Sequence, residues 1–255
     1  MRLNIVVLFL TVILISCSKK PDEKPSVPNI SYSVVNSFPH DTAAFIEGFL
    51  IHNGELYEST GDKESWIGVI DVKTGKAARK VELEKKYFGE GMTILNNKVY
   101  WLTYRHHLGF VYDFKSFREI GQFTYDTEGW GMTNDNRNII MSDGSEKLYF
   151  LDTVSLKPVR TLTVKNNGEA LRGINELEFI EGYIFANVWQ TSNVVKIDMQ
   201  TGEVVGMLDL SPLTKLAREL KPEVDVLNGI AWHEQTRLLL VTGKLWPHIY
   251  VLKIK

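Results

Sequence analysis

The strongest constraint on the fold of this chain is an internal repeat with a period of roughly 40–45 residues. Each repeat carries a marker, a polar or aromatic residue followed by a small or polar residue and then an apolar one. The five markers begin at Glu47, Glu90, Trp130, Asn175 and Asn228. A chain reversal and two further strand-like runs follow each marker. Several short strands per repeat are typical of propeller blades, so the sequence predicts an all-β, five-bladed β-propeller.

The two ends of the chain are expected to complete the last blade together. The first four repeats continue into a fourth strand-like run, at 77–83, 119–125, 159–164 and 204–210, whereas the fifth ends at Lys255 directly after its third run. An unpaired edge strand would be a liability in a closed ring. We therefore expect residues 31–38 to supply the missing outer strand, within a propeller domain that spans 31–255.

The longest interval between markers contains a different pattern at residues 211–220. Pro212 follows Ser211, and the apolar residues after them have helical spacing. Serine is a good N-cap residue, and proline is favoured at the first helical position. The pattern predicts one short helix inserted between the fourth and fifth blades, with Ser211 as its N-cap.

The N-terminus predicts export and a lipid anchor. Arg2 precedes an apolar run over 5–15 that is too short to span a membrane as a helix, which is typical of a signal peptide over 1–16. The segment ends like a bacterial lipoprotein signal, and Cys17 is the only cysteine of the chain. We expect cleavage before a lipidated Cys17, a flexible charged tether over 17–30, and attachment to a bacterial membrane on its periplasmic side or at the cell surface. A plain secretory signal with an incidental cysteine is the alternative.

Composition excludes some functions. The net charge is −2, and no Lys/Arg cluster is interleaved with aromatic residues, so we expect no nucleic-acid partner. The six histidines show no metal-ligand spacing, and the adjacent His106 and His107 would point to opposite sides of a strand. We therefore expect no metal or other cofactor, and a monomeric protein.

The markers also predict a functional site. The first strand of every propeller blade lines the central channel, so the five marker residues should surround one rim. The second strands end at the same rim and should bring Tyr104, Trp189 and Lys244 to it. A channel filled by satisfied polar groups is one interpretation. The variety of residue types at matched positions favours the other, asymmetric recognition of a ligand.

At these residues the chain resembles the glutamine cyclotransferase family of plants and bacteria. The resemblance is carried by Phe88-Gly89-Glu90-Gly91-Met92, Gly129-Trp130-Gly131-Met132, and the segments 225–232 and 241–247. It implies a five-bladed propeller that converts an N-terminal glutamine of peptides or proteins into pyroglutamate, with loss of ammonia and without a metal. It implies catalytic roles for Glu90, Asn175 and Lys244. We expect substrate contacts from Phe45, Glu47, Phe88, Tyr104, Trp130, Trp189 and Asn228.

In the mechanism that we expect, Glu90 takes the proton of the attacking amine and returns it to the leaving nitrogen, and Asn175 or Lys244 stabilises the oxyanion. Two of the expected substrate-contacting residues depart from the family pattern. Glu47 stands where the family usually has glutamine, and Tyr104 replaces a tryptophan. Glu47 could keep one of the two acids protonated, or could hold the substrate ammonium. The alternatives are a non-catalytic propeller that binds a peptide or small polar ligand, and a metal-dependent hydrolase with a channel cation.

Overall fold

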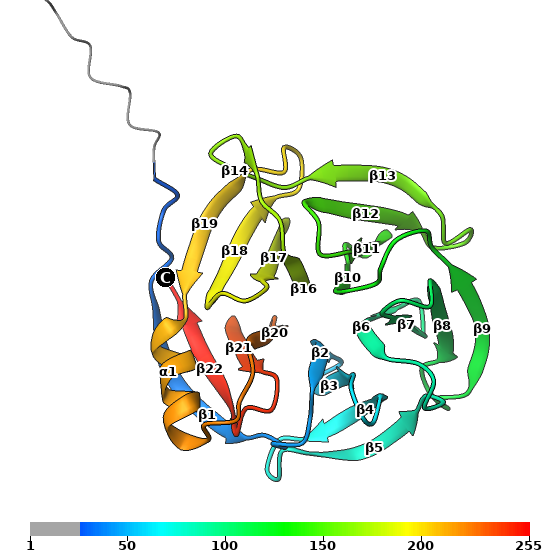
Figure 1. Cartoon of the computed structure of the whole chain (residues 1–255), viewed down its shortest axis with the longest axis horizontal. Coiled ribbons are helices and arrows are strands. Elements are labelled where there is room, and N and C mark those ends of the chain that lie inside the picture. The colour runs from blue at the N-terminus through cyan, green and yellow to red at the C-terminus, as the bar shows by residue number, and fades with distance from the viewer. Residues whose placement is uncertain (1–25) are drawn as a thin grey trace, which may run out of the picture.

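A computed structural model describes residues 26–255 as a ring of five four-stranded antiparallel sheets around a central channel (Figure 1). The five-bladed propeller expected from the repeat is confirmed. In each of the first four blades the strands follow chain order outward from the channel. The expected signal segment and Cys17 lie outside the described residues.

The blades have the following strands. Blade one contains β2 (Ile46–His52), β3 (Glu55–Thr60), β4 (Trp66–Asp71) and β5 (Lys76–Glu82). Blade two contains β6 (Gly89–Leu95), β7 (Lys98–Thr103), β8 (Leu108–Asp113) and β9 (Glu119–Thr124). Blade three contains β10 (Met132–Asn134), β11 (Asn138–Ser142), β12 (Lys147–Asp152) and β13 (Pro158–Thr163). Blade four contains β16 (Ile174–Ile180), β17 (Tyr183–Val188), β18 (Asn193–Asp198) and β19 (Val204–Asp209). Blade five contains β20 (Leu227–His233), β21 (Leu238–Gly243), β22 (His248–Ile254) and β1 (Tyr32–Pro39). A small hairpin that we did not expect, β14 (Lys165–Asn166) with β15 (Glu169–Ala170), lies between blades three and four.

The N-terminal strand closes the ring as predicted. β1 pairs antiparallel with β22, with a register shift between Val34 and Asn36. The backbone N–H of Lys255 donates to the carbonyl of Ser31 at 2.9 Å, so the two ends of the domain are joined. Figure 1 shows β1 beside β22 at the outer edge of blade five.

The propeller begins slightly earlier than the boundary expected at residue 31. Ile30 N donates to Met207 O at 2.8 Å, and Met207 N donates to Pro28 O at 3.0 Å. Val27 packs against the core between blades three and four. The last residues of the expected tether therefore cover the exposed edge of β19, because an open edge would otherwise present unpaired backbone groups.

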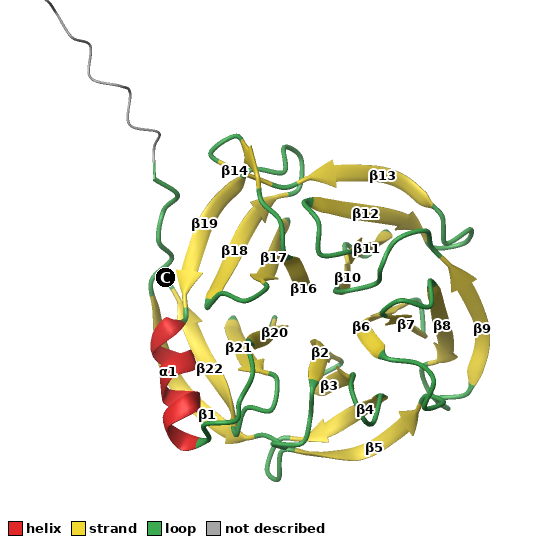
Figure 2. Ribbon diagram, viewed as in Figure 1, coloured by secondary structure: helices red, strands yellow, loops and turns green. Residues whose placement is uncertain are grey.

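The predicted helix is present as α1 (Ser211–Leu220), on the outside of the ring (Figure 2). It is the only helix in residues 26–255. The N-cap prediction was wrong, because the N-cap position is Leu210 and no side chain caps it. Asp209, the last residue of β19, instead accepts a hydrogen bond from Ser211 N at 2.9 Å. A carboxylate two residues upstream can reach that amide, which leaves the Ser211 hydroxyl without a capping role.

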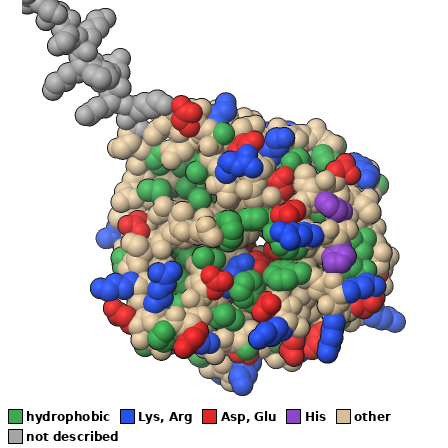
Figure 3. Space-filling view, in the orientation of Figure 1, with side chains coloured by type: hydrophobic (Ala, Val, Ile, Leu, Met, Phe, Trp, Pro, Cys, Tyr) green, Lys and Arg blue, Asp and Glu red, His purple; other side chains and the backbone are tan. Residues whose placement is uncertain are grey.

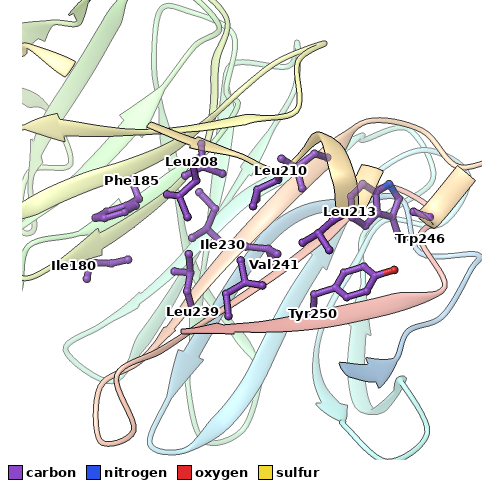
Figure 4. Packing of buried hydrophobic residues seen from close by; sticks show 14 of the residues in the cluster. Ile180, Phe185, Leu208, Leu210, Leu213, Ile230, Leu239, Val241, Trp246 and Tyr250 are labelled. Atoms are coloured by element: carbon purple, nitrogen blue, oxygen red, sulfur yellow. The ribbon is translucent and has the colours of Figure 1, made fainter. Parts of the chain in front are cut away.

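The hydrophobic core is divided among the five boundaries between blades. Each boundary has its own cluster of buried side chains, contributed by the two blades that meet there. Helix α1 adds Leu213 and Ala217 to the cluster between blades four and five, where Figure 4 shows Leu213 near Trp246 and Tyr250. No helix in the described part of the chain is long and apolar enough to cross a membrane.

A buried ion pair lies where the ring closes. His40 follows β1, and its Nε2 lies 3.0 Å from Glu58 Oε2 while its Nδ1 lies 2.9 Å from the carbonyl oxygen of Trp246. Both ring nitrogens therefore face acceptors, which suits the imidazolium form. Burial alone would lower the pKa of His40, but the charge and hydrogen bond of Glu58 outweigh it, and the pKa is raised. The pair joins blade one to blade five.

We predict that this pair makes stability depend on pH. Because the pKa of His40 is higher in the folded chain than its unfolded value near 6.5, the stabilisation is complete below that value and is lost as pH rises through the folded pKa. His40→Gln should therefore lower the free energy of unfolding by about 3 kcal/mol at pH 6, and by less at high pH. Urea unfolding of both proteins from pH 6 to 9 measures this, with the exposed His106→Gln as control. Parallel curves for wild type and His40→Gln would contradict it.

Candidate active site

The backbone is irregular at the markers. The pairing of the first two strands shifts register between Ile46 and Gly48, Gly89 and Met92, Ile174 and Leu177, and Leu227 and Ile230. In blade three the marker at Trp130 precedes β10 altogether. Such bulges break the strict in-and-out alternation of a strand and re-aim side chains, often next to active sites. The five repeats therefore change backbone geometry at the same level of the channel.

The markers are held by hydrogen bonds from neighbouring blades. One such bond crosses each of the five boundaries: Ser59 Oγ to Glu90 O (2.7 Å), Gly91 N to Trp130 O (2.7 Å), Ser142 Oγ to Asn175 O (2.7 Å), Gly229 N to Asn187 Oδ1 (2.9 Å) and Asn228 Nδ2 to Ile46 O (3.0 Å). Two marker glycines are required by this close approach. A Cβ on Gly91 would lie 2.5 Å from Trp130 O, and one on Gly131 would lie 2.0 Å from Asn175 O.

Two of the predicted acids meet the predicted lysine. Lys244 Nζ lies 2.5 Å from Glu47 Oε1, and Asn228 Nδ2 donates to Glu47 Oε2 at 3.3 Å. Glu90 is also hydrogen-bonded to Glu47. Glu47, Glu90 and Lys244 are only 1%, 5% and 7% exposed, so water screens their charges poorly. Three blades thus contribute to one enclosed charge cluster.

The two acids differ in the groups that shift their pKa values. Burial and the charge of Glu47 raise the pKa of Glu90 well above its ordinary value, although Lys244 partly opposes this. Burial also raises the pKa of Glu47, but the charge and hydrogen bond of Lys244 counteract it. Two acids that share one site lose their protons in separate steps. The pKa of Glu47 is raised as well, but Glu47 has the direct cationic partner, which favours its ionised form over that of Glu90.

The predicted aromatic residues form a continuous arc beside this cluster. The five rings, in order, are Phe45, Phe88, Tyr104, Trp130 and Trp189. Successive ring centroids are 6.1, 5.8, 6.4 and 5.5 Å apart. Lys244 Nζ lies 4.4 Å from the centroid of Phe45, which joins the arc to the acids. Trp189, at the other end, is 43% exposed. We refer to the arc together with Glu47, Glu90, Asn175, Asn228 and Lys244 as the cup. Figure 3 shows hydrophobic, acidic and basic side chains around a narrow opening at the centre of one face.

Two buried amides in the cup have an atom without a partner. Asn175 is 3% exposed and Asn228 is fully buried, yet neither Oδ1 has a hydrogen-bond partner in the described structure. Unsatisfied buried acceptors are uncommon and call for an explanation. The cup therefore has acceptor capacity to spare for a ligand that carries N–H groups.

Glu128 and Arg105 contact residues of the cup, and the sequence analysis missed both. Glu128 accepts hydrogen bonds from Trp130 Nε1 and from Arg105 Nε, both at 3.1 Å. Arg105 also donates to Tyr104 Oη at 3.0 Å, with its guanidinium carbon 4.5 Å from the centroid of that ring. The only signal in the sequence is proximity, because each residue lies one or two positions from a predicted cup residue. Their pairing depends on the loop conformations.

Other polar features of the channel lie outside the cup. Glu176 accepts hydrogen bonds from Phe49 N (3.3 Å) and Ile230 N (2.8 Å), so it joins blade four to blades one and five.

A cavity of about 720 Å³ opens at the opposite end of the channel, where the hairpins of the inner strands lie. Its lining includes Glu178 and Arg237 but none of the predicted site residues. We place the site in the cup because the coupled acids and the aromatic arc are there. Within residues 26–255, no group of three or more His, Cys, Asp or Glu side chains is placed to hold a metal ion.

Comparison with known proteins agrees with this architecture. The chain is 37% identical over 226 residues to glutaminyl-peptide cyclotransferase of Arabidopsis thaliana, covering 87% of this chain and 71% of the relative. Its structure superposes on the crystal structure of Myxococcus xanthus glutaminyl cyclase with a TM-score of 0.85 and 32% identity, covering 91% of this chain and 99% of the other. A Bacteroides caccae protein of unknown function shares the fold alone, with a TM-score of 0.51, 15% identity, and 64% and 66% of the two chains covered. The sequence model of the glutamine cyclotransferase family matches residues 7–254, and the chain belongs to this family.

Proposed function

We propose that this chain is a glutaminyl-peptide cyclotransferase that acts on peptides or proteins with an N-terminal glutamine. The observation that carries the proposal is the enclosed Glu90 carboxyl, which lies in the cup beside Glu47 and Lys244. The family match and the two similar cyclases support the reaction class.

The reaction is an intramolecular acyl transfer. The α-amine nitrogen attacks the side-chain amide carbon, a ring C–N bond forms, and the original C–N bond breaks to release ammonia. One proton must pass from the attacking nitrogen to the leaving nitrogen. Because the nucleophile is already tethered, a cup that holds the side chain folded back can remove several kcal/mol from the barrier. The aromatic arc from Phe45 to Trp189 offers rigid walls for that task.

Glu90 is the proposed proton shuttle. Its pKa is raised by burial and by Glu47, which brings the carboxyl toward the pH at which proton transfer in both directions is efficient. No second acid needs to take part in the transfer, because the proton lost by one nitrogen is gained by the other.

Lys244 and Asn175 have the remaining polar roles in the proposed reaction. The Lys244 ammonium has three N–H donors and, within residues 26–255, a single hydrogen-bond partner, Glu47, so donors remain for the developing oxyanion. Asn175 Oδ1 lacks a partner and can accept from an N–H of the substrate. Glu47 is engaged by Lys244, which argues against a cup that traps the substrate ammonium on a free carboxylate.

The proposed reaction uses no metal. The support is the donor set of the cup, in which Lys244 occupies the place beside Glu47 that a cation would take. Turnover should therefore survive dialysis against a strong chelator.

We predict that Glu90→Gln reduces ammonia release from a Gln-initiated dipeptide by about 10²–10⁴-fold, because the amide cannot carry the proton. A coupled ammonia assay, with mass spectrometry of the pyroglutamyl product, measures this. Glu234→Gln, at the opposite end of the channel, is the matched control and should retain activity. A Glu90→Gln protein whose kcat/KM stays within about threefold of wild type would remove Glu90 from this role.

We also propose that the protein is exported and anchored through a lipid on Cys17. The support is the signal-like sequence before the single cysteine. The first described residues lie along β19, at the outer edge of the ring. A tether attached there leaves the cup open to peptides.

Cys17→Ser should move the protein from the membrane fraction to the unbound fraction of an expressing bacterium, and should abolish incorporation of a labelled fatty acid. Ser16→Ala, which keeps the cysteine, is the control. Fatty-acid label retained by Cys17→Ser would contradict the anchor.

A further inference from the structure

We propose that Glu47 is a positioning residue that holds Glu90 in its protonated form, so that the reaction begins with Glu90 as an acid rather than as a base. The inference rests on the proposed function, and it concerns an acid that a neutral glutamine could not replace, because an amide could not supply the charge.

The hydrogen bonds around Glu47 determine where the shared proton lies. Lys244 donates to one carboxylate oxygen at 2.5 Å, and Asn228 donates to the other at 3.3 Å. A carboxylate whose two oxygens both face N–H donors is an acceptor only. Glu90 is bonded to the same carboxylate, and two ionised carboxylates cannot share a hydrogen bond. The proton between the two acids therefore belongs to Glu90.

Two further charged groups act on Glu90, one in the same direction as Glu47 and one against it. Glu128, from the loop between β9 and β10, adds negative charge and disfavours ionisation of Glu90. Lys244 opposes this, but its ammonium is bound to Glu47 and also lies over the ring of Phe45 at 4.4 Å. Tyr125 remains neutral, because burial raises its pKa to about 12.

One more charge faces Glu47. Asp225, in the segment before β20, raises the pKa of Glu47, while the charge and hydrogen bond of Lys244 and the hydrogen bond with Glu90 lower it. The contact with Lys244 is a direct one, with Nζ 2.5 Å from Glu47 Oε1. Glu47 therefore remains the ionised partner when only one proton is present.

This charge distribution suits the chemistry. The ionised Glu47 and Lys244 neutralise each other, and a protonated Glu90 adds no charge, so the three groups do not favour the unreactive ammonium form of the substrate. The free α-amine then attacks the amide carbon. Glu90 gives its proton to the leaving nitrogen as the C–N bond breaks, and the resulting carboxylate takes a proton from the new ring nitrogen. Ammonia leaves and Glu90 is protonated again, so atoms and charges balance.

The direct test follows the carboxyl of Glu90 without any substrate. The purified full chain is labelled with ¹³C at the glutamate side-chain carboxyls, and the resonance that disappears in Glu90→Gln is titrated by NMR. In Glu47→Gln, Lys244 is free to pair with Glu90, so the titration midpoint should fall by about one to three units. Glu234→Gln, at the far end of the channel, should leave it unchanged. A midpoint that is unchanged or higher in Glu47→Gln would overturn the inference.

The kinetic test uses the pH profile of kcat/KM for a Gln-initiated dipeptide. If Glu90 must start protonated, the basic limb of the profile reports the pKa of Glu90. In Glu47→Gln this limb should move to lower pH by about one to three pH units, as in the NMR titration. Glu47→Asp keeps the charge and should move the limb back toward wild type. A basic limb that does not move would overturn the inference, provided that melting curves show that Glu47→Gln is folded. A shifted NMR midpoint without ammonia release from any of these proteins would instead refute the proposed cyclase function and leave the electrostatic pairing intact.

Discussion

The close approach of the inner strands at the channel mouth is the constraint on which the rest of the structure depends. One hydrogen bond crosses each blade boundary at the level of the markers, and Gly91 and Gly131 lie so close to the next blade that no side chain fits. This geometry at each boundary stabilises the closed ring, because a missing bond would leave a buried backbone group unsatisfied. Outside this level, the boundaries are filled by ordinary apolar packing.

The same contacts assemble the site. Glu47, Glu90 and Lys244 come from blades one, two and five, and they meet because the bulged strands that carry the two acids are held by their neighbours. Pre-organised charges in a dry site are more effective than the same charges in water, since they need not reorganise during the reaction. The scaffold and the proposed chemistry therefore share one set of backbone contacts, while the aromatic arc adds a wall that depends on loops.

Closure of the ring uses a separate set of interactions. β1 pairs with β22, and the buried His40–Glu58 pair joins the segment after β1 to blade one. Neither lies in the cup. His40 makes stability at the ring closure depend on pH, whereas Glu90 and Glu47 control the pH dependence of the proposed reaction.

Much of the architecture was determined by the sequence itself. The repeat predicted five blades, the missing fourth run predicted that the N-terminal strand closes the last one, and the spacing over 211–220 predicted α1. The marker positions and the ends of the second strands also predicted which residues meet in the cup. These features can be predicted from the sequence because strand and helix periodicity are local properties of the chain.

Only the tertiary structure decided how those residues pair. It assigned Lys244 to Glu47 rather than to Glu90, gave Glu128 and Arg105 a place beside Trp130 and Tyr104, replaced Ser211 by Asp209 at the start of α1, and attached Pro28 and Ile30 to β19. The Lys244–Glu47 contact and the pairing of Pro28 and Ile30 with Met207 join residues far apart in the chain, whereas Asp209–Ser211 and Glu128–Trp130 are local contacts. No local pattern encodes distances of an ångström or two between side chains on different blades, and those distances determine which acid keeps its proton.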